Sequence, residues 1–221
     1  MNIHVVLPLA VVGTSIACYF SGVPLLQDII APTANREFGL IENLQHLILL
    51  GVALTALRAA RRGGSLAWWV IALGATLALL EEVDYGQHWV RLASGDPTPG
   101  EPVNLHNQGQ LNDWLKRATD LGMLLVFGLL PFLLRRPRPD WVPSPWSLAT
   151  LALGFLLSRV VHSLDEAGIA TNEALTSNLS EFRETITYWV VALYVFERNA
   201  SVPGGAPPEV RLDGGPPAPG T

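Results

Sequence analysis

Glutamate, aspartate and histidine recur at helical spacing in four stretches of this sequence. Residues three, four or seven positions apart lie on the same side of an α-helix. The four groups are Glu42 with His46; Glu81, Asp84 and His88; His162, Asp165 and Glu166; and Glu181, Glu184 and Tyr188. Carboxylates and imidazoles bind divalent metals and transfer protons in acid–base catalysis. The spacing therefore predicts a site at which several helices present such groups to one another.

The chemistry that these groups indicate first is that of a metal-dependent hydrolase or transferase. We expect Glu82, His162 and Asp165 to bind a divalent metal, with Zn²⁺ or Fe favoured by mixed ligands and Mg²⁺ or Mn²⁺ by oxygen ligands. Glu81 or Glu42 is the expected base, acting on water bound to that metal, and His106 is expected to close over the substrate. The other residues expected to line the cavity are His46, Asp84, His88, Asn104, Asn107, Arg159, Glu166, Glu181 and Glu184.

The stretches that hold these groups are long and apolar, which predicts an all-α membrane protein. Hydrophobic residues make up 49% of the 221 residues and charged residues 15%, against about 25% charged residues in soluble domains. Six segments approach the roughly 20 apolar residues needed to cross a bilayer: 3–26, 40–58, 65–90, 113–134, 146–166 and 182–198. We expect one polytopic helix bundle over residues 1–199, with about six transmembrane helices, and a disordered tail rich in Pro and Gly over residues 200–221.

Arginine clusters set the predicted orientation of the bundle. Three arginines lie at positions 58 to 62, after the second segment, and three at positions 135 to 138, after the fourth. Such clusters mark the cytoplasmic side of a membrane protein. Both termini are then cytoplasmic, the protein lies in the inner (cell) membrane, and 15 of the 19 carboxylates fall on or near the outer side.

The ionisable groups share a depth in the predicted membrane. At 1.5 Å per helical residue from the inner anchors, Glu42, Glu81 and His162 lie roughly 22–24 Å up a hydrocarbon core about 30 Å thick. Charges at this depth cost several kcal/mol unless they face the bundle interior and find partners. One hydrated cavity that opens outward would accommodate them all. Arg159 lies deeper, and we expect it to be buried and paired with a glutamate across the bundle: Glu81, Glu82 or Glu184.

Two short motifs contain several of these predicted site residues. Glu81-Glu82 followed by Gly86-Gln87, and then Asn104-Leu105-His106-Asn107, resemble an uncharacterised family of bacterial multi-pass membrane proteins. The pattern Glu37-x-Gly39-x-x-Glu42-Asn43 fits the same family, and the resemblance covers roughly residues 36–110. It implies that these motifs share a site, and it implies no particular reaction.

Other functions stay open on the sequence. A proton-coupled transporter would also use intramembrane Glu, His and Arg, although no internal repeat is present. A non-catalytic subunit or assembly factor would use the polar face to bind a protein partner. The expected partners are the lipid bilayer and a lipid or lipid-linked substrate, whereas nucleic acid is excluded because no basic patch alternates with aromatic residues.

Overall fold

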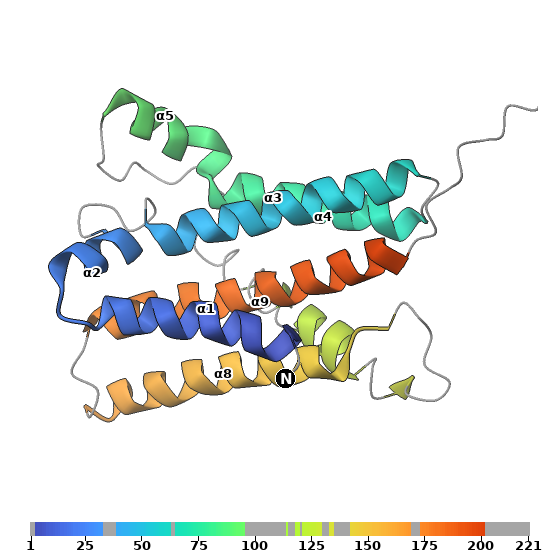
Figure 1. The fold of residues 1–221 in the computed structure, drawn as a ribbon. Coiled ribbons are helices and arrows are strands. Elements are labelled where there is room, and N and C mark those ends of the chain that lie inside the picture. The colour runs from blue at the N-terminus through green and yellow to red at the C-terminus, as the bar shows by residue number, and fades with distance from the viewer. Residues whose placement is uncertain are drawn as a thin grey trace, which may run out of the picture.

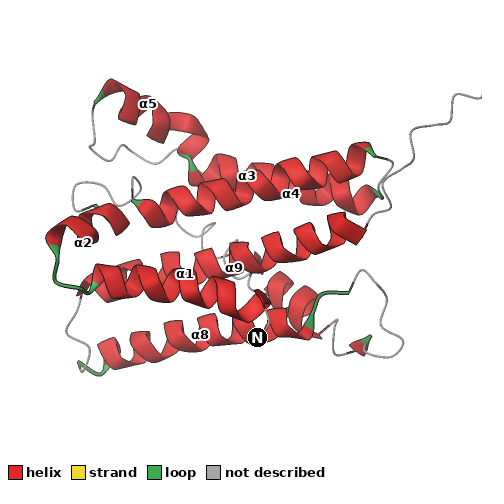
Figure 2. Cartoon of the chain, viewed as in Figure 1, coloured by secondary structure: helices red, strands yellow, loops and turns green. Residues whose placement is uncertain are grey.

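The chain folds into a bundle of long helices that lie side by side (Figure 1). The computed structural model describes residues 3–32, 39–62, 65–95, 114, 118–119, 121–129, 133–134, 142–168 and 173–201. The elements are α1 Ile3–Tyr19, α2 Pro24–Ile30, α3 Leu40–Arg61, α4 Leu66–Glu82, η2 Asp84–Gly86, α5 Gln87–Ser94, the π-helix η4 Leu124–Leu129, α8 Pro145–Glu166 and α9 Glu173–Ser201. Within this described part every regular element is helical and no strand occurs, as the sequence predicts (Figure 2).

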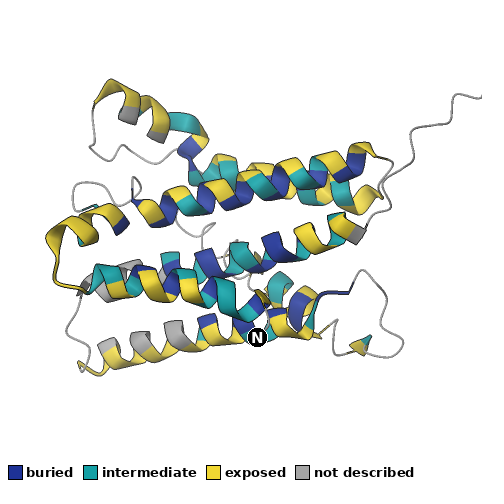
Figure 3. Cartoon of the chain, viewed as in Figure 1, coloured by how far each residue is buried: buried dark blue, intermediate teal, exposed yellow. Residues whose placement is uncertain are grey.

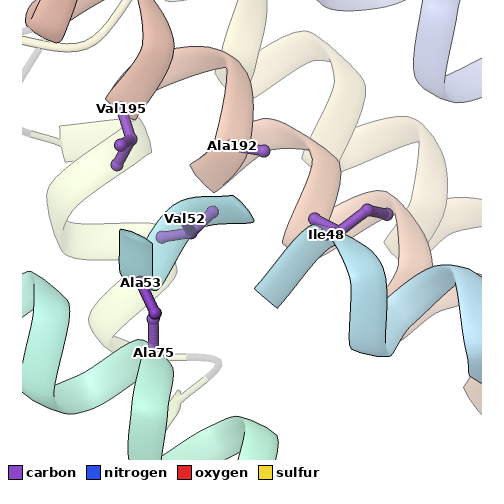
Figure 4. Packing of buried hydrophobic residues seen from close by; sticks show 6 residues of the cluster. All are labelled: Ile48, Val52, Ala53, Ala75, Ala192 and Val195. Carbon is purple, nitrogen blue, oxygen red and sulfur yellow. The ribbon is translucent and has the colours of Figure 1, made fainter. Parts of the chain in front are cut away.

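Helix α9 is the centre of the bundle and packs against α1, α3 and α8, while α4 packs on the other side of α3. One core cluster joins α3, α4 and α9 through small and branched residues (Figure 4): Ile48, Val52, Ala53, Ala75, Ala192 and Val195. Alanines at such contacts let helix backbones approach closely. Helices α3 and α9 run in the same direction and α4 runs in the opposite one, so the start of α3 lies beside the end of α4 and the first half of α9.

A second cluster ties the N-terminal helices to this centre. Val12 of α1, Ile30 of α2 and Ile41 of α3 pack with Phe182 and Ile186 of α9. Helix α8 joins through a glycine, because a Cβ atom added at Gly154 would lie 3.2 Å from the Ile186 Cδ1 atom. Close helix approach at a small residue is the usual packing mode where lipid, rather than water, surrounds a bundle.

The number of membrane-length helices is lower than the six predicted. In the described residues α3 is the one helix long and apolar enough to cross a membrane, and α4 with Asp84–Arg91 makes a second if that bent pair counts as one span. Helix α1 and the apolar part of α8, Pro145–Leu156, are shorter. Helix α9 is continuous, but charged residues at both ends of its apolar stretch make that stretch too short to meet the same criterion. Eight of the 22 residues of the predicted segment 113–134, and the tail beyond residue 201, lie outside the described residues.

Two of the predicted segments are broken rather than straight. Segment 3–26 ends as a helix at Tyr19, and α2 restarts at Pro24 after Gly22, whose φ is +72°. Segment 65–90 ends as a straight helix at Glu82, and the chain then bends by 61° into η2 and α5. The bend removes the predicted common helix face of Glu81, Asp84 and His88, because that face requires one continuous helix.

The start of α1 is held against the end of α9. His4 Nε2 and Glu197 Oε1 form an ion pair, and the His4 side chain is almost fully buried. Thr150 of α8 donates its hydroxyl to the His4 carbonyl oxygen at 2.6 Å. Three helices therefore meet at the end of the bundle opposite the start of α3.

The substitution Glu197→Gln is expected to lower the free energy of unfolding by about 1 kcal/mol, since the pair is half-exposed on the glutamate side. The measurement is detergent-induced unfolding in mixed micelles. A double-mutant cycle with His4→Ala isolates the pair. If Glu197→Gln costs the same in the His4→Ala background, the ion pair contributes nothing to stability.

Candidate functional site

Three helices bring carboxyl groups together at the end of the bundle where α3 begins. Glu42 lies in the first turn of α3, Glu82 in the last turn of α4, and Glu181 and Glu184 lie on α9. The Glu42 carboxyl hydrogen-bonds to that of Glu181 and lies within electrostatic range of Glu82 and Glu184. We call these four residues the acidic cluster.

The acidic cluster is largely removed from the surface. Only 7% of Glu42 is exposed, and the other three side chains are half-buried. The Tyr188 hydroxyl of α9 donates a hydrogen bond of 2.6 Å to Glu82 Oε1, which ties α9 to the end of α4. This bond orients one carboxylate of the cluster.

The contact between Glu42 and Glu181 has a chemical requirement. A carboxylate is only an acceptor, so two carboxyl groups hydrogen-bond when one of them carries a proton. Four acidic groups this close need protons or a bound cation to offset their mutual repulsion. The contact between Glu42 and Glu181 therefore favours a protonated carboxyl group in the cluster.

A neutral polar network lies beneath the acidic cluster. Gln45 is fully buried, and its Nε2 donates to the Glu181 carbonyl oxygen and to Thr185 Oγ1, each at 3.0 Å. Thr185 in turn donates to the Glu181 carbonyl oxygen at 2.8 Å. These bonds lock α3 to α9 one turn below Glu42, which positions Glu42 and Glu181 relative to each other.

The Gln45 side-chain oxygen is different from its nitrogen. Gln45 Oε1 is buried and accepts no hydrogen bond from the described part of the chain, and a buried polar atom left this way costs about 1–3 kcal/mol. Sequence reasoning did not select Gln45. A detectable signal was present, since an amide three residues after Glu42 within an apolar stretch indicates a polar role inside the bundle.

The structure brings together four of the predicted site residues, the members of the acidic cluster. His46 is buried on α3, one turn after Glu42. Glu81 differs from the prediction, because its carboxylate accepts a hydrogen bond from exposed Tyr85 rather than joining the cluster. Neighbouring residues of a helix point about 100° apart, so Glu81 and Glu82 have different partners although both are half-buried. Of the two candidate bases, the geometry favours Glu42.

Asp84 is buried at the bend after α4 rather than on a helix face shared with Glu81 and His88. Arg159 is exposed on α8, so the predicted burial against a carboxylate across the bundle is wrong. Helix α8 buries the face that carries Thr150, Leu151 and Gly154, and Arg159 lies to one side of that face.

The remaining predicted residues are less well placed by the structure. Glu166 is exposed at the end of α8. His88, His162 and Asp165 lie in helices, but their side chains fall outside what the structure describes. His106, expected to close over the substrate, and the expected cavity residues Asn104 and Asn107 also lie outside the described part. Because the His162 side chain is not described, the pairing of Glu82 with His162 stays a prediction.

A metal centre is not formed by the described side chains alone. Among them, no three His, Cys, Asp or Glu residues come together in a way that would hold a metal ion. The side chains of two of the three predicted ligands, His162 and Asp165, lie outside that set, so the predicted metal site stays a prediction.

Comparison with known proteins does not suggest a function. No family model matches the chain, and no curated protein and no solved structure matches it either. The acidic cluster and the surface of the bundle around it are therefore the features that bear on function.

Proposed function

We propose that this chain is a multi-pass membrane protein whose acidic cluster is the working site of a hydrolase or transferase for a lipid or lipid-linked substrate. The observation that carries the proposal is the burial of Glu42 among three more carboxyl groups inside an apolar bundle. Ionisable groups in such a place are costly for stability and are typical of functional sites.

The outer surface of the bundle supports the membrane location. A stripe of exposed large apolar side chains runs along α4: Leu66, Val70, Leu73, Leu77 and Leu80. Exposed leucines and valines also occur on α3 and α8, and exposed residues cover the outward sides of these helices (Figure 3). A helix at a water-facing surface places polar residues there instead, and an apolar surface this extensive indicates contact with lipid or protein.

The predicted topology of six spans, both termini cytoplasmic and a location in the inner membrane, is part of this proposal. The contact between His4 and Glu197 supports it, because the start of α1 and the end of α9 then lie at one end of the bundle. Arg58 and Arg61 lie in the last turn of α3, at the end remote from Glu42. Arginines at one end and the acidic cluster at the other agree with a cytoplasmic and an outer side.

The acidic cluster has the parts that acid–base catalysis needs. A pair of carboxyl groups that shares one proton offers an acid and a base at the same place. Glu42 is our candidate for the base, and Glu181 is the partner that takes or returns the proton. Tyr188 fixes Glu82 beside this pair.

In the metal-dependent form of the proposal, Glu82, His162 and Asp165 hold the ion. This mixed set of imidazole and carboxylate ligands suits Zn²⁺ or Fe, while a site of carboxylates alone suits Mg²⁺ or Mn²⁺. The ion would lower the pKa of a bound water and so supply a nucleophile at neutral pH. The bond from Tyr188 to Glu82 is the kind of outer contact that orients a metal ligand.

A proton-coupled transporter is the second candidate, and one observation favours it. The hydrogen bond between Glu42 and Glu181 requires a shared proton, and carboxyl groups inside a bundle are the usual elements of proton relays. In a transporter of this kind, the acidic cluster would exchange its proton for a cation.

Metal analysis of the purified protein separates these candidates. We expect the wild type to bind Mn²⁺ or Zn²⁺ at one ion per chain, and Glu82→Gln to lose that binding. Glu197→Gln is the matched control, because its carboxylate lies at the other end of the bundle. A wild type that binds no metal would overturn the metal-dependent form, and proton uptake by proteoliposomes, followed with a pH-sensitive dye, would then favour transport.

A further inference from the structure

Helix α5 stands away from the rest of the bundle. It follows α4 after the 61° bend, projects outward in Figure 1, and its principal contact in the described part of the chain is with the short η2 turn. Nothing in that part of the chain covers two of its large side chains: 54% of Trp89 and 70% of Val90 is exposed.

The bend that sets the direction of α5 is specified by the local backbone. Asp84, Tyr85 and Gly86 all have positive φ, at 47°, 53° and 91°. This region is costly for residues with a Cβ atom, and glycine adopts it freely. The Asp84 side chain is buried, and the Tyr85 hydroxyl bonds to the Glu81 carboxylate across the turn. Such a conformation persists because its surroundings hold it in place.

The residues of α5 divide into two faces. Gln87, Arg91 and Ser94 fall at i, i+4 and i+7 and form a polar face, whereas Trp89 and Ala93 share the opposite side with Val90 at its edge. A helix with a cationic polar face and an apolar face that carries Trp is typical of segments that lie in a membrane interface. Trp also prefers the boundary between headgroups and acyl chains.

We propose that α5 lies flat in the outer headgroup region of the membrane, with Trp89, Val90 and Ala93 toward the acyl chains and Arg91 toward lipid phosphates. The proposal rests on the membrane location argued above. Continuity with α4 selects lipid as the occupant, because a helix that leaves a span at 61° enters the interface directly. Helix α5 then anchors the end of α4 and sets the depth of Glu82, five residues before Gln87.

Site-directed spin labelling tests this placement. In a Cys18→Ser background, single cysteines replace residues 89, 90, 91, 93 and 94 in turn, and the protein is reconstituted into phosphatidylcholine–phosphatidylglycerol vesicles. Collision with oxygen reports lipid exposure, and collision with a water-soluble nickel chelate reports water exposure. We expect positions 89, 90 and 93 to favour oxygen and positions 91 and 94 to favour nickel, so that depth oscillates with the helical period.

Three other outcomes would overturn the proposal. Depth that changes steadily from 89 to 94 indicates a straight span, uniform nickel access indicates a helix in water, and low access to both reagents at 89 and 90 indicates contact with protein. Labels at Leu73 and Leu77 of α4 serve as the reference, because both are exposed on the apolar stripe. Nickel access at these two positions would reject the membrane location itself, which separates that failure from a failure of the α5 placement alone.

Discussion

Replacing Phe182 with alanine is expected to lower the free energy of unfolding by about 3 kcal/mol. Phe182 is 2% exposed and is the largest fully buried side chain among the described residues, in the cluster that joins α1, α2, α3 and α9. The substitution leaves a cavity where four helices meet. The cost lies at the lower end of the range for buried Phe because, in the membrane location proposed above, the bundle gains its stability from packing rather than from removal of apolar surface from water.

Phe196→Ala on the same helix is the matched control, since 41% of Phe196 is exposed. Unfolding in mixed micelles, followed by far-ultraviolet circular dichroism, compares the two variants with the wild type. We expect the Phe196 variant to lose less than about 1 kcal/mol, as surface substitutions generally do. Equal losses for the two variants would mean that α9 is not the centre of the bundle.

The substitution Glu42→Gln, unlike Phe182→Ala, is expected to stabilise the protein. It should raise the free energy of unfolding at neutral pH by about 1–2 kcal/mol. The glutamine amide keeps the size of the side chain and donates a hydrogen bond to Glu181 without needing a proton. It also removes one of four acidic groups that repel one another. Functional sites commonly show this gain in stability, accompanied by loss of function.

The same unfolding assay tests this prediction, with Glu197→Gln as the comparison. Both variants replace a glutamate with glutamine, but Glu197 has the His4 imidazole as a hydrogen-bonding partner, whereas Glu42 has further acidic groups beside it. The two variants should therefore shift stability in opposite directions. If Glu42→Gln is destabilised as much as Glu197→Gln, the acidic cluster has a structural role, and the proposed hydrolase or transferase loses its main support.

The sequence by itself was sufficient for the helical character and for the faces of single helices. Apolar blocks predicted segments 40–58 and 182–198, and the structure has α3 over Leu40–Arg61 and α9 over Glu173–Ser201. The i, i+3, i+7 spacing of Glu181, Glu184 and Tyr188 predicted a shared face, and both glutamates lie within electrostatic range of Tyr188. Helical periodicity is a local property of the chain, so the residue order alone determines it.

The direction of the chain after α4 needed the three-dimensional structure. Residues 65–90 are apolar enough to predict one straight span, and the structure instead breaks that span after Glu82. The bend depends on Asp84 and Tyr85, which few sequences place in the left-handed region. Their conformation is held by burial of Asp84 and by the contact of Tyr85 with Glu81, and neither is visible in a hydropathy pattern.

The membership of the site was decided by tertiary packing. The sequence placed both residues in the site, Glu82 as a metal ligand and Glu81 as a candidate base, yet of the two it is Glu82 that accepts a hydrogen bond from Tyr188 of α9. It also favoured a buried Arg159, which is exposed, and it gave Gln45 no role, although Gln45 links α3 to α9. These outcomes depend on how far each helix is rotated about its own axis. That rotation is set by close contacts between helices, such as Ala53 with Ala75 and Gly154 with Ile186, which no single segment contains.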